Sequence, residues 1–152
     1  MTYEVGIEKL APRILAAVRR RVTIKDIGKE FKPALDKVWA FLRTHAGLRT
    51  DGHNIFLYHH DSPAIMTVDF GVEVVRRFDR EGDVECVTTP AGEAAVVVHR
   101  GPYDQMSAGH QALKQWCAAN GRTIGNYSLE IYGDWSDDPE KVETTIQYLL
   151  RT

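Results

Sequence analysis

One succession of elements occurs twice along the chain, and this internal repeat constrains the fold more than any other feature of the sequence. Each half reads as strand, strand, helix, strand, strand, with a proline between its first two strands. The halves, about 1–78 and 79–152, keep three pairs of residues in equivalent positions, at offsets of 78, 77 and 74 residues: Pro12 and Pro90, Trp39 and Trp116, and Tyr58 and Tyr132. We interpret the 152 residues as one domain that arose by duplication.

Apolar periodicity predicts the same elements in both halves. In the first half these are strands at 3–10 and 14–18, a helix over 29–45, and strands at 54–58 and 68–74. In the second half they are strands at 84–87 and 94–98, a helix that Asp104 can cap and that ends near Gly121, and strands at 129–132 and 142–148. We expect the first two strands of each half to pair as a hairpin, because a proline-containing turn joins them.

This order of elements predicts an α+β fold. A helix covers one face of the strands beside it, so two halves placed side by side would share one sheet and leave its other face open. We therefore expect a duplicated strand-helix-strand-strand module, with two long helices on one face of an antiparallel sheet and a ligand cleft on the other.

The strand within residues 128–135 carries the most unusual face of the predicted sheet. Side chains alternate along a strand, so Glu130 and Tyr132 point one way while Leu129 and Ile131 point the other. An unpaired carboxylate is costly to bury. We interpret this face as a binding surface, opposite Phe56 in the first half; the alternative is that Glu130 is a rim residue paired with an arginine.

Composition excludes several function classes. Apolar residues make up 43% and charged residues 26% of the chain, as in ordinary globular proteins. The first fifteen residues contain no unbroken apolar run, so they resemble neither a signal peptide nor a membrane span, and we expect a cytoplasmic protein. The run Arg19-Arg20-Arg21 is the one candidate basic patch. We interpret it as a charged strand end and expect no direct contact with nucleic acid.

No metal or cofactor site is expected. The histidines His53, His59 and His60 lack a fourth ligand at a recognised spacing. The two cysteines, Cys86 and Cys117, are far apart and in no paired motif, which favours free thiols. The sequence contains neither a phosphate-binding glycine loop nor a supported catalytic triad.

Several segments of the second half together resemble the GyrI-like family, the effector-binding domains of AraC-type and MerR-type regulators that also occur as free-standing proteins. The segments are His99-Arg100-Gly101-Pro102-Tyr103, the helix with Trp116, Asn120-Gly121, Leu129-Glu130-Ile131-Tyr132 and a proline-containing acidic loop. The resemblance implies a ligand cleft between the two repeats, where Glu130 would meet a cationic, aromatic, lipophilic molecule.

The candidate ligand-binding residues are Glu130 and the residues that would surround it: Phe56, Tyr58, Tyr103, Tyr132, Trp135, Trp39, Trp116 and His99. Some of these have a structural alternative. Trp39 and Trp116 lie on apolar helical stripes and can be core residues. His99, next to Gly101, can have a purely structural role. Tyr103 can either begin the second helix or face the cleft, and Trp135 is expected as a lid.

The sequence is compatible with three functions. Because residue 3 already lies in the first strand, we expect no DNA-binding domain ahead of the module and favour free-standing capture of a small molecule. The resemblance also implies two alternatives. One is hydrolysis of cyclopropane-containing genotoxins, with Glu130 and Tyr103 as catalytic residues; Glu130 would act as a general base if burial raised its pKa. The other is inhibition of DNA gyrase, through the acidic loop 134–140.

Overall fold

The computed structural model describes residues 3–62, 64–134 and 136–151, and omits the side chains of residues 49–52. The strands are β1 (Gly6–Leu10), β2 (Ile14–Thr23), β3 (Arg49–His59), β4 (Ile65–Val74), β5 (Val84–Thr88), β6 (Gly92–Arg100), β7 (Ile124–Tyr132) and β8 (Glu143–Leu150). The helices are α1 (Ile27–Arg43) and α2 (Ser107–Ala119), with short 3-10 turns η1 (Ile24–Asp26), η2 (Ala46–Leu48), η3 (Tyr103–Gln105) and η4 (Pro139–Lys141).

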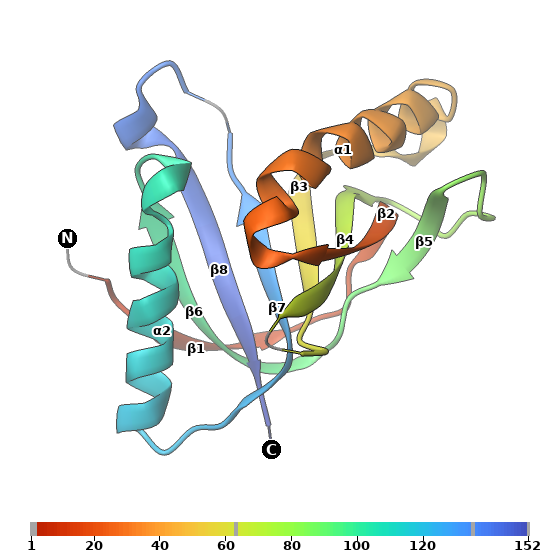
Figure 1. Cartoon of the computed structure of the whole chain (residues 1–152). Helices are drawn as coiled ribbons and strands as arrows, with labels where there is room; N and C mark the ends of the chain where they lie inside the picture. The colour runs from red at the N-terminus through yellow and green to blue at the C-terminus, as the bar shows by residue number, and fades with distance from the viewer. Residues whose placement is uncertain (1–2, 63, 135, 152) are drawn as a thin grey trace.

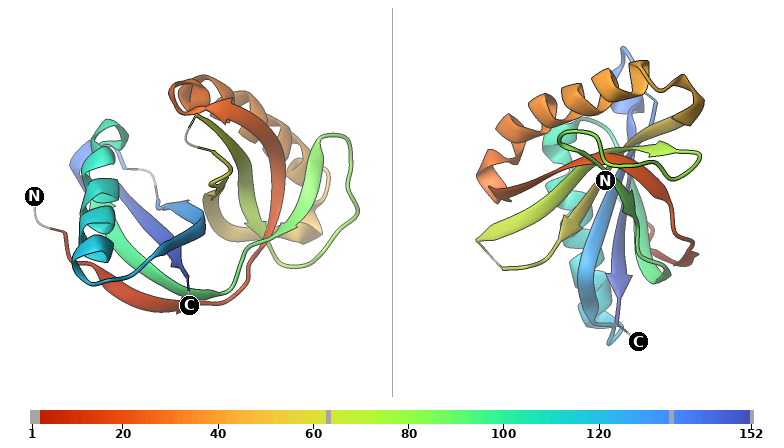
Figure 2. Two further views of the ribbon diagram at one scale, coloured as in Figure 1. Left: turned by 60° about the horizontal axis from the view of Figure 1, so that its bottom comes forward. Right: turned by 90° about the vertical axis from the view of Figure 1, so that its right-hand side faces the viewer.

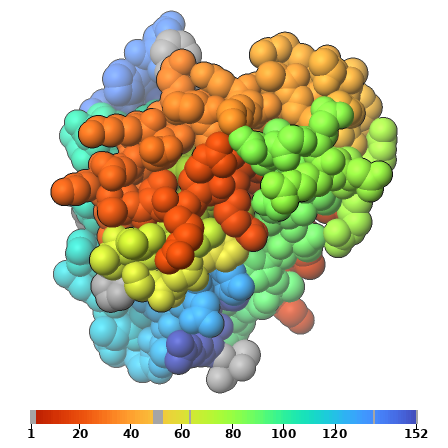
Figure 3. Space-filling model, turned by 45° about the vertical axis from the view of Figure 1, so that its right-hand side comes forward, coloured from red at the N-terminus to blue at the C-terminus, as the bar shows by residue number. Residues whose placement is uncertain are grey.

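The eight strands form one antiparallel sheet, in the order β1-β6-β8-β7-β3-β4-β2-β5 (Figure 1). If β1 is exchanged with β5, β2 with β6, β3 with β7 and β4 with β8, this order reads the same from either end. The space-filling view shows the segments of the first half, red to yellow, packed directly against the blue strands of the second (Figure 3). The predicted α+β class, with one antiparallel sheet and two long helices, is confirmed.

Neither predicted hairpin forms, because the first strand of each half crosses to the other half. Strand β1 pairs with β6, and β5 pairs with β2. The linkers around Pro12 and Pro90 contain no turn, and a proline disfavours helical backbone in the residue before it. The linkers also bond to each other: the Arg13 amide donates to Thr89 Oγ1 at 2.7 Å, and the Thr89 amide donates to the Arg13 carbonyl at 2.9 Å. The exchange therefore ties the two halves together.

One helix covers each half of the sheet, on the same side (Figures 1 and 2). Helix α1 buries Leu35, Val38 and Leu42 against the first half, and α2 buries Leu113 and Cys117 against the second. Both helices lie within two residues of their predicted positions. The predicted cap is wrong: Asp104 lies in η3, and the residue before α2 makes no capping bond through its side chain.

The face away from the helices is closed where the central strands meet. It buries a cluster that includes Leu15, Ala17, Ile55, Leu57 and Leu129. Glycine at position 71 of β4 permits this close packing, since a Cβ atom there would lie 3.1 Å from the Ala17 Cβ. The cleft that contains Glu130 was therefore predicted on the wrong face, because its two cavities lie on the helix side, between α1 and α2. A smaller cavity of about 390 Å³ on the other face is lined by Leu129, Gln147 and residues of the two linkers.

No helix among the described residues is long and apolar enough to cross a membrane.

Candidate functional site

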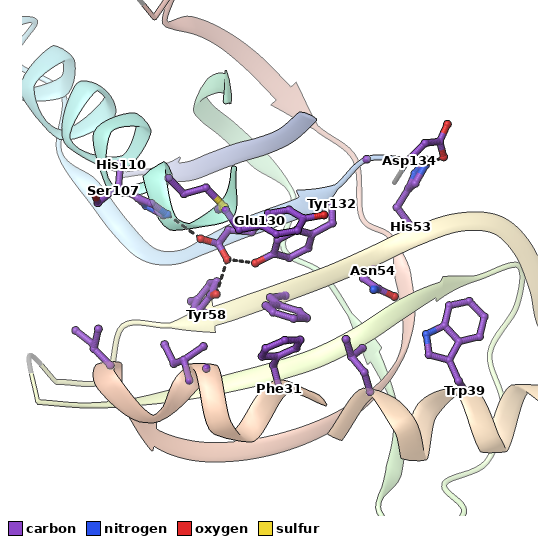
Figure 4. A pocket seen from close by; sticks show the side chains of 18 residues that line it. Phe31, Trp39, His53, Asn54, Tyr58, Ser107, His110, Glu130, Tyr132 and Asp134 are labelled. Carbon is purple, nitrogen blue, oxygen red and sulfur yellow. Dashed lines mark hydrogen bonds and ion pairs between the residues drawn. The ribbon is translucent and has the colours of Figure 1, made fainter. Parts of the chain in front are cut away.

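The cleft has its floor on the two central strands, which neither helix covers. Strands β3 and β7 pair so that Phe56 lies opposite Glu130 and Tyr58 opposite Ser128. Their side chains on the helix side form the floor, as the alternation of strand residues predicted for Glu130 and Tyr132. The walls come from the helices: Phe31 and Trp39 of α1 reach toward β3 in Figure 4, and His110 reaches in from α2.

Glu130 is buried at the centre of this floor, with 6% of its surface exposed. The hydroxyls of Tyr58 and Tyr132 donate to its Oε1 atom at 2.5 and 2.6 Å, and His110 Nε2 donates to its Oε2 atom at 2.7 Å (Figure 4). Among the described residues no arginine or lysine pairs with it. The rim ion pair with an arginine, which was the alternative interpretation, is therefore wrong.

These partners keep Glu130 ionised. Burial by itself raises the pKa of the carboxyl, but the hydrogen bond and charge of His110 and the bonds from Tyr132 and Tyr58 outweigh it, so the pKa lies below its ordinary value. Burial and the neighbouring carboxylate raise the pKa of both tyrosines, which stay protonated donors. Glu130 therefore does not have the raised pKa that its alternative role as a general base would require.

His110 is the site residue that the sequence analysis missed. It lies between Glu130 and Tyr148, whose hydroxyl is 2.6 Å from His110 Nδ1. Because a hydroxyl can donate or accept, this imidazole satisfies both neighbours whether it is neutral or protonated. A signal was present in the sequence: position 110 follows Met106 by four residues and precedes Leu113 by three, so it shares their face of the helix.

One cavity of the cleft, which we call the first chamber, has a volume of about 770 Å³. Aromatic rings dominate its lining, with centroid distances of 4.8 Å between Phe56 and Tyr132 and 5.6 Å between Tyr103 and Tyr132. Among the residues whose side chains the structure describes, the charged residues of the lining are Glu130 and Asp134, and none is a lysine or arginine. The chamber therefore favours an apolar body that carries positive charge.

The structure brings most of the candidate residues together. Those that line the first chamber are Glu130, Phe56, Tyr58, Tyr103, Tyr132 and Trp39. Trp116 packs instead against the core of the second half. Trp135 lies outside the described residues.

His99 is fully buried away from the chamber. Its Nε2 atom donates to the Pro102 carbonyl at 2.9 Å, and its Nδ1 atom accepts from the Tyr3 hydroxyl at 2.9 Å. Gly101, which lies between His99 and Pro102 in the sequence, has φ of 132°, a conformation that other residues rarely adopt. His99 thus fixes the turn that presents Tyr103.

The three histidines considered as metal ligands have different partners rather than a common metal. His53 Nε2 bonds Asp134 at 2.8 Å, His59 Nε2 bonds Asp69 at 2.7 Å, and His60 Nε2 bonds Ser128 at 2.8 Å. Within the part of the chain that the structure describes, no group of three potential metal ligands comes together.

The family follows from the sequence itself, since the model of the GyrI-like small molecule binding domain matches residues 3–151. The chain belongs to the GyrI-like family. No curated protein matches it significantly.

Solved structures share the fold. The C-terminal domain of EcmrR is 26% identical, with a TM-score of 0.83, covering 100% of this chain and 99% of that domain. In the EcmrR–DNA complex the identity is 25% and the TM-score 0.79, and the match covers 99% of this chain but only 58% of that one.

Two more distant structures show the fold alone, at 14% identity and 97% coverage of this chain. SAV2435 bound to tetraphenylphosphonium has a TM-score of 0.73 over 94% of its chain, and a hydrolase from Listeria innocua has a TM-score of 0.67 over 92%.

Proposed function

We propose that this GyrI-like protein captures a lipophilic, cationic aromatic molecule in the first chamber, with Glu130 as its counter-charge. The observation that carries the proposal is an ionised carboxylate buried at the floor of an aromatic cavity, where no described side chain of the lining is a lysine or arginine. The family binds small molecules, and the fold neighbour SAV2435 holds a cation with several aromatic rings.

The surroundings of Glu130 suit a cation without strong hydrogen-bond donors. Its oxygens already accept three bonds, so a delocalised or quaternary cation can approach without displacing Tyr58, Tyr132 or His110. A desolvated aromatic ring adds about 2 kcal/mol of attraction to such a cation, and apolar burial adds about 25 cal/mol per Å². The buried Oδ1 atom of Asn54, which accepts no hydrogen bond from any described residue, offers a second contact to a ligand with an N–H group.

Titration calorimetry with tetraphenylphosphonium tests the proposal. We expect Glu130→Gln to weaken binding at least tenfold, because it removes the buried charge and keeps the side-chain shape. The matched control is Asp36→Asn, since the Asp36 side chain is 69% exposed, lines neither chamber and has its charge screened by solvent. Equal affinity of wild type and Glu130→Gln would refute the role of Glu130, and a fall in both variants alike would point to general electrostatic attraction.

A hydrolytic function of the same site is a second candidate, favoured by the chain of contacts from Glu130 through His110 to Tyr148. Such a chain can pass a proton while water adds to a strained ring. Incubation with a cyclopropane-bearing alkylating compound should then give a product heavier by one water in mass spectrometry, and His110→Gln should abolish it. Recovery of the intact compound from the wild-type protein would remove this candidate.

Inhibition of DNA gyrase finds no comparable support. In the described part of the acidic loop, the Asp138 side chain accepts from the Glu140 amide at 3.0 Å, which is the behaviour of a capped, solvated turn.

A further inference from the structure

The cleft contains a second cavity, which we call the second chamber, on the other side of the contact between Glu130 and His110. Its volume is about 720 Å³, close to that of the first. The two chambers share a common wall of five residues: Ile24, Ile27, Tyr58, His110 and Glu130. Beyond this wall the polar lining of the second chamber is His60, Lys114, Ser128 and Tyr148, together with Asp61 and Ser62.

The pairing of the central strands relates the floors of the two chambers. Phe56 lies directly opposite Glu130, and these positions are 74 residues apart, the offset that also relates Tyr58 to Tyr132. A twofold axis between Phe56 and Glu130 therefore exchanges the two ends of the floor. By the same offset, Ser128 of the second chamber stands where Asn54 stands in the first, and His60 stands where Asp134 stands. An acidic position of the first chamber is thus a basic one in the second.

Lys114 is the charge of the second chamber that no described residue compensates. It is exposed on α2, and no described residue forms an ion pair or a hydrogen bond with it. The two acidic groups of the lining are bonded to other residues of the chain. Glu130 is bonded to His110, and Asp61 accepts from the Thr67 hydroxyl at 2.5 Å.

His60 is another basic side chain that lines this chamber. Burial lowers the pKa of its imidazole, and the positive charges of Lys114, His110 and His59 lower it further, against the opposite effect of Asp61. Its Nε2 atom is 2.8 Å from Ser128 Oγ, while no described residue bonds to its Nδ1 atom. An acidic group in the chamber would therefore meet both an ammonium group and an imidazole.

We propose that the second chamber binds a small organic anion, an aromatic carboxylate or sulfonate, whose acidic group pairs with Lys114. The apolar side chains Met66 and Ile124 and the ring of Tyr148 contact its hydrocarbon part. The first and second chambers then prefer ligands of opposite charge. This inference goes beyond capture of a cation and does not depend on it, because the anion is recognised by residues that the first chamber lacks.

The probe is 8-anilinonaphthalene-1-sulfonate, followed by its fluorescence and by calorimetry. We expect Lys114→Gln to weaken its binding about fivefold, the size of one partly exposed charge pair. Lys37→Gln is the matched control: position 37 precedes 114 by the offset that relates Trp39 to Trp116, and Lys37 is paired with Asp83 outside both chambers. We expect dye binding to be unchanged in that variant.

Competition locates the dye. Saturating tetraphenylphosphonium should leave the dye bound, and Glu130→Gln should bind the dye at least as tightly as the wild type. Displacement of the dye by the cation, or equal dye affinity in the wild type and Lys114→Gln, would overturn the proposal. Loss of cation binding alone would affect only the function proposed for the first chamber.

Discussion

Two buried carboxylates lie on opposite faces of the same sheet, and they are held in different ways. Asp69 of β4, fully buried on the face away from the helices, accepts from Arg19 Nε and Nη2 at 2.7 and 3.2 Å and from His59 at 2.7 Å. Glu130 of β7, on the cleft face, accepts from two tyrosine hydroxyls and one imidazole. Each carboxyl has a lowered pKa although burial by itself would raise it.

The identity of the partners separates a structural carboxylate from one available to a ligand. The guanidinium of Arg19 is always charged, so the charge of Asp69 is compensated at every working pH. The partners of Glu130 include no permanent cation among the described residues, and Glu130 faces a cavity that can admit one. A lowered pKa is common to both sites and therefore does not reveal which one binds ligand.

The largest expected effect is on stability. Asp69→Ala should lower the free energy of unfolding by about 3 kcal/mol, because it strands Arg19 and His59 without their shared acceptor. The value is at the low end for a broken buried pair, since Arg19 is half-exposed and can turn to water. Glu130→Gln should change stability by about 1 kcal/mol or less, because its amide still accepts from the tyrosines. Urea unfolding of both variants measures the difference, and equal losses would break the comparison.

The pH dependence of the unfolding free energy below neutral pH also compares Asp69 with Glu130. Both carboxyls have pKa values below those of the unfolded chain, which are about 4, so their contributions are complete above that value. They are lost as the pH falls through the folded-state pKa values, because the unfolded chain then binds more protons. We expect the unfolding free energy to fall with decreasing pH below about 4, and Asp69→Ala to fall less steeply than the wild type. Parallel acid limbs in chemical unfolding would contradict this assignment.

Local patterns predicted the parts of the molecule that depend on neighbours in sequence. Period-two alternation placed Glu130 and Tyr132 on one face, and helical spacing placed both helices within two residues. The repeat also identified Phe56 as the counterpart of Glu130, and the two are partners across the central strands. These features are fixed by the backbone geometry of single elements, which a sequence displays directly.

Long-range choices were not predictable in the same way. A proline linker such as that at Pro12 suits either a hairpin or a crossing to the other half. The crossing is visible only in the structure, in the pairing of β1 with β6 and in the Arg13–Thr89 bonds between the two linkers. The cleft lies on the helix side because α1 and α2 leave the centre of the sheet uncovered. The sequence predicts the length of each helix but not the gap between them. His110 was overlooked because a single histidine in an apolar helical stripe resembles a core residue until its partners in two distant strands are known.

The smallest expected effect concerns His60, which faces the cleft, whereas its neighbour His59 faces the other side of the sheet. His59 bonds the structural Asp69, whereas His60 faces Lys114, His110 and Asp61 in the second chamber. Because the folded-state pKa of His60 is lowered, its contribution to stability is complete above the unfolded value of about 6.5 and is lost as the pH falls through the folded value.

As the pH rises toward 6.5, the wild type should therefore gain a small amount of unfolding free energy that His60→Gln does not gain. Proton NMR of the imidazole should give a titration midpoint below 6.5, and Lys114→Gln should move it upward, because one of the positive charges that depress it is gone. A midpoint above 6.5 in the wild type would mean that Asp61, rather than Lys114, sets the field of the second chamber, and the contrast in charge between the chambers would disappear.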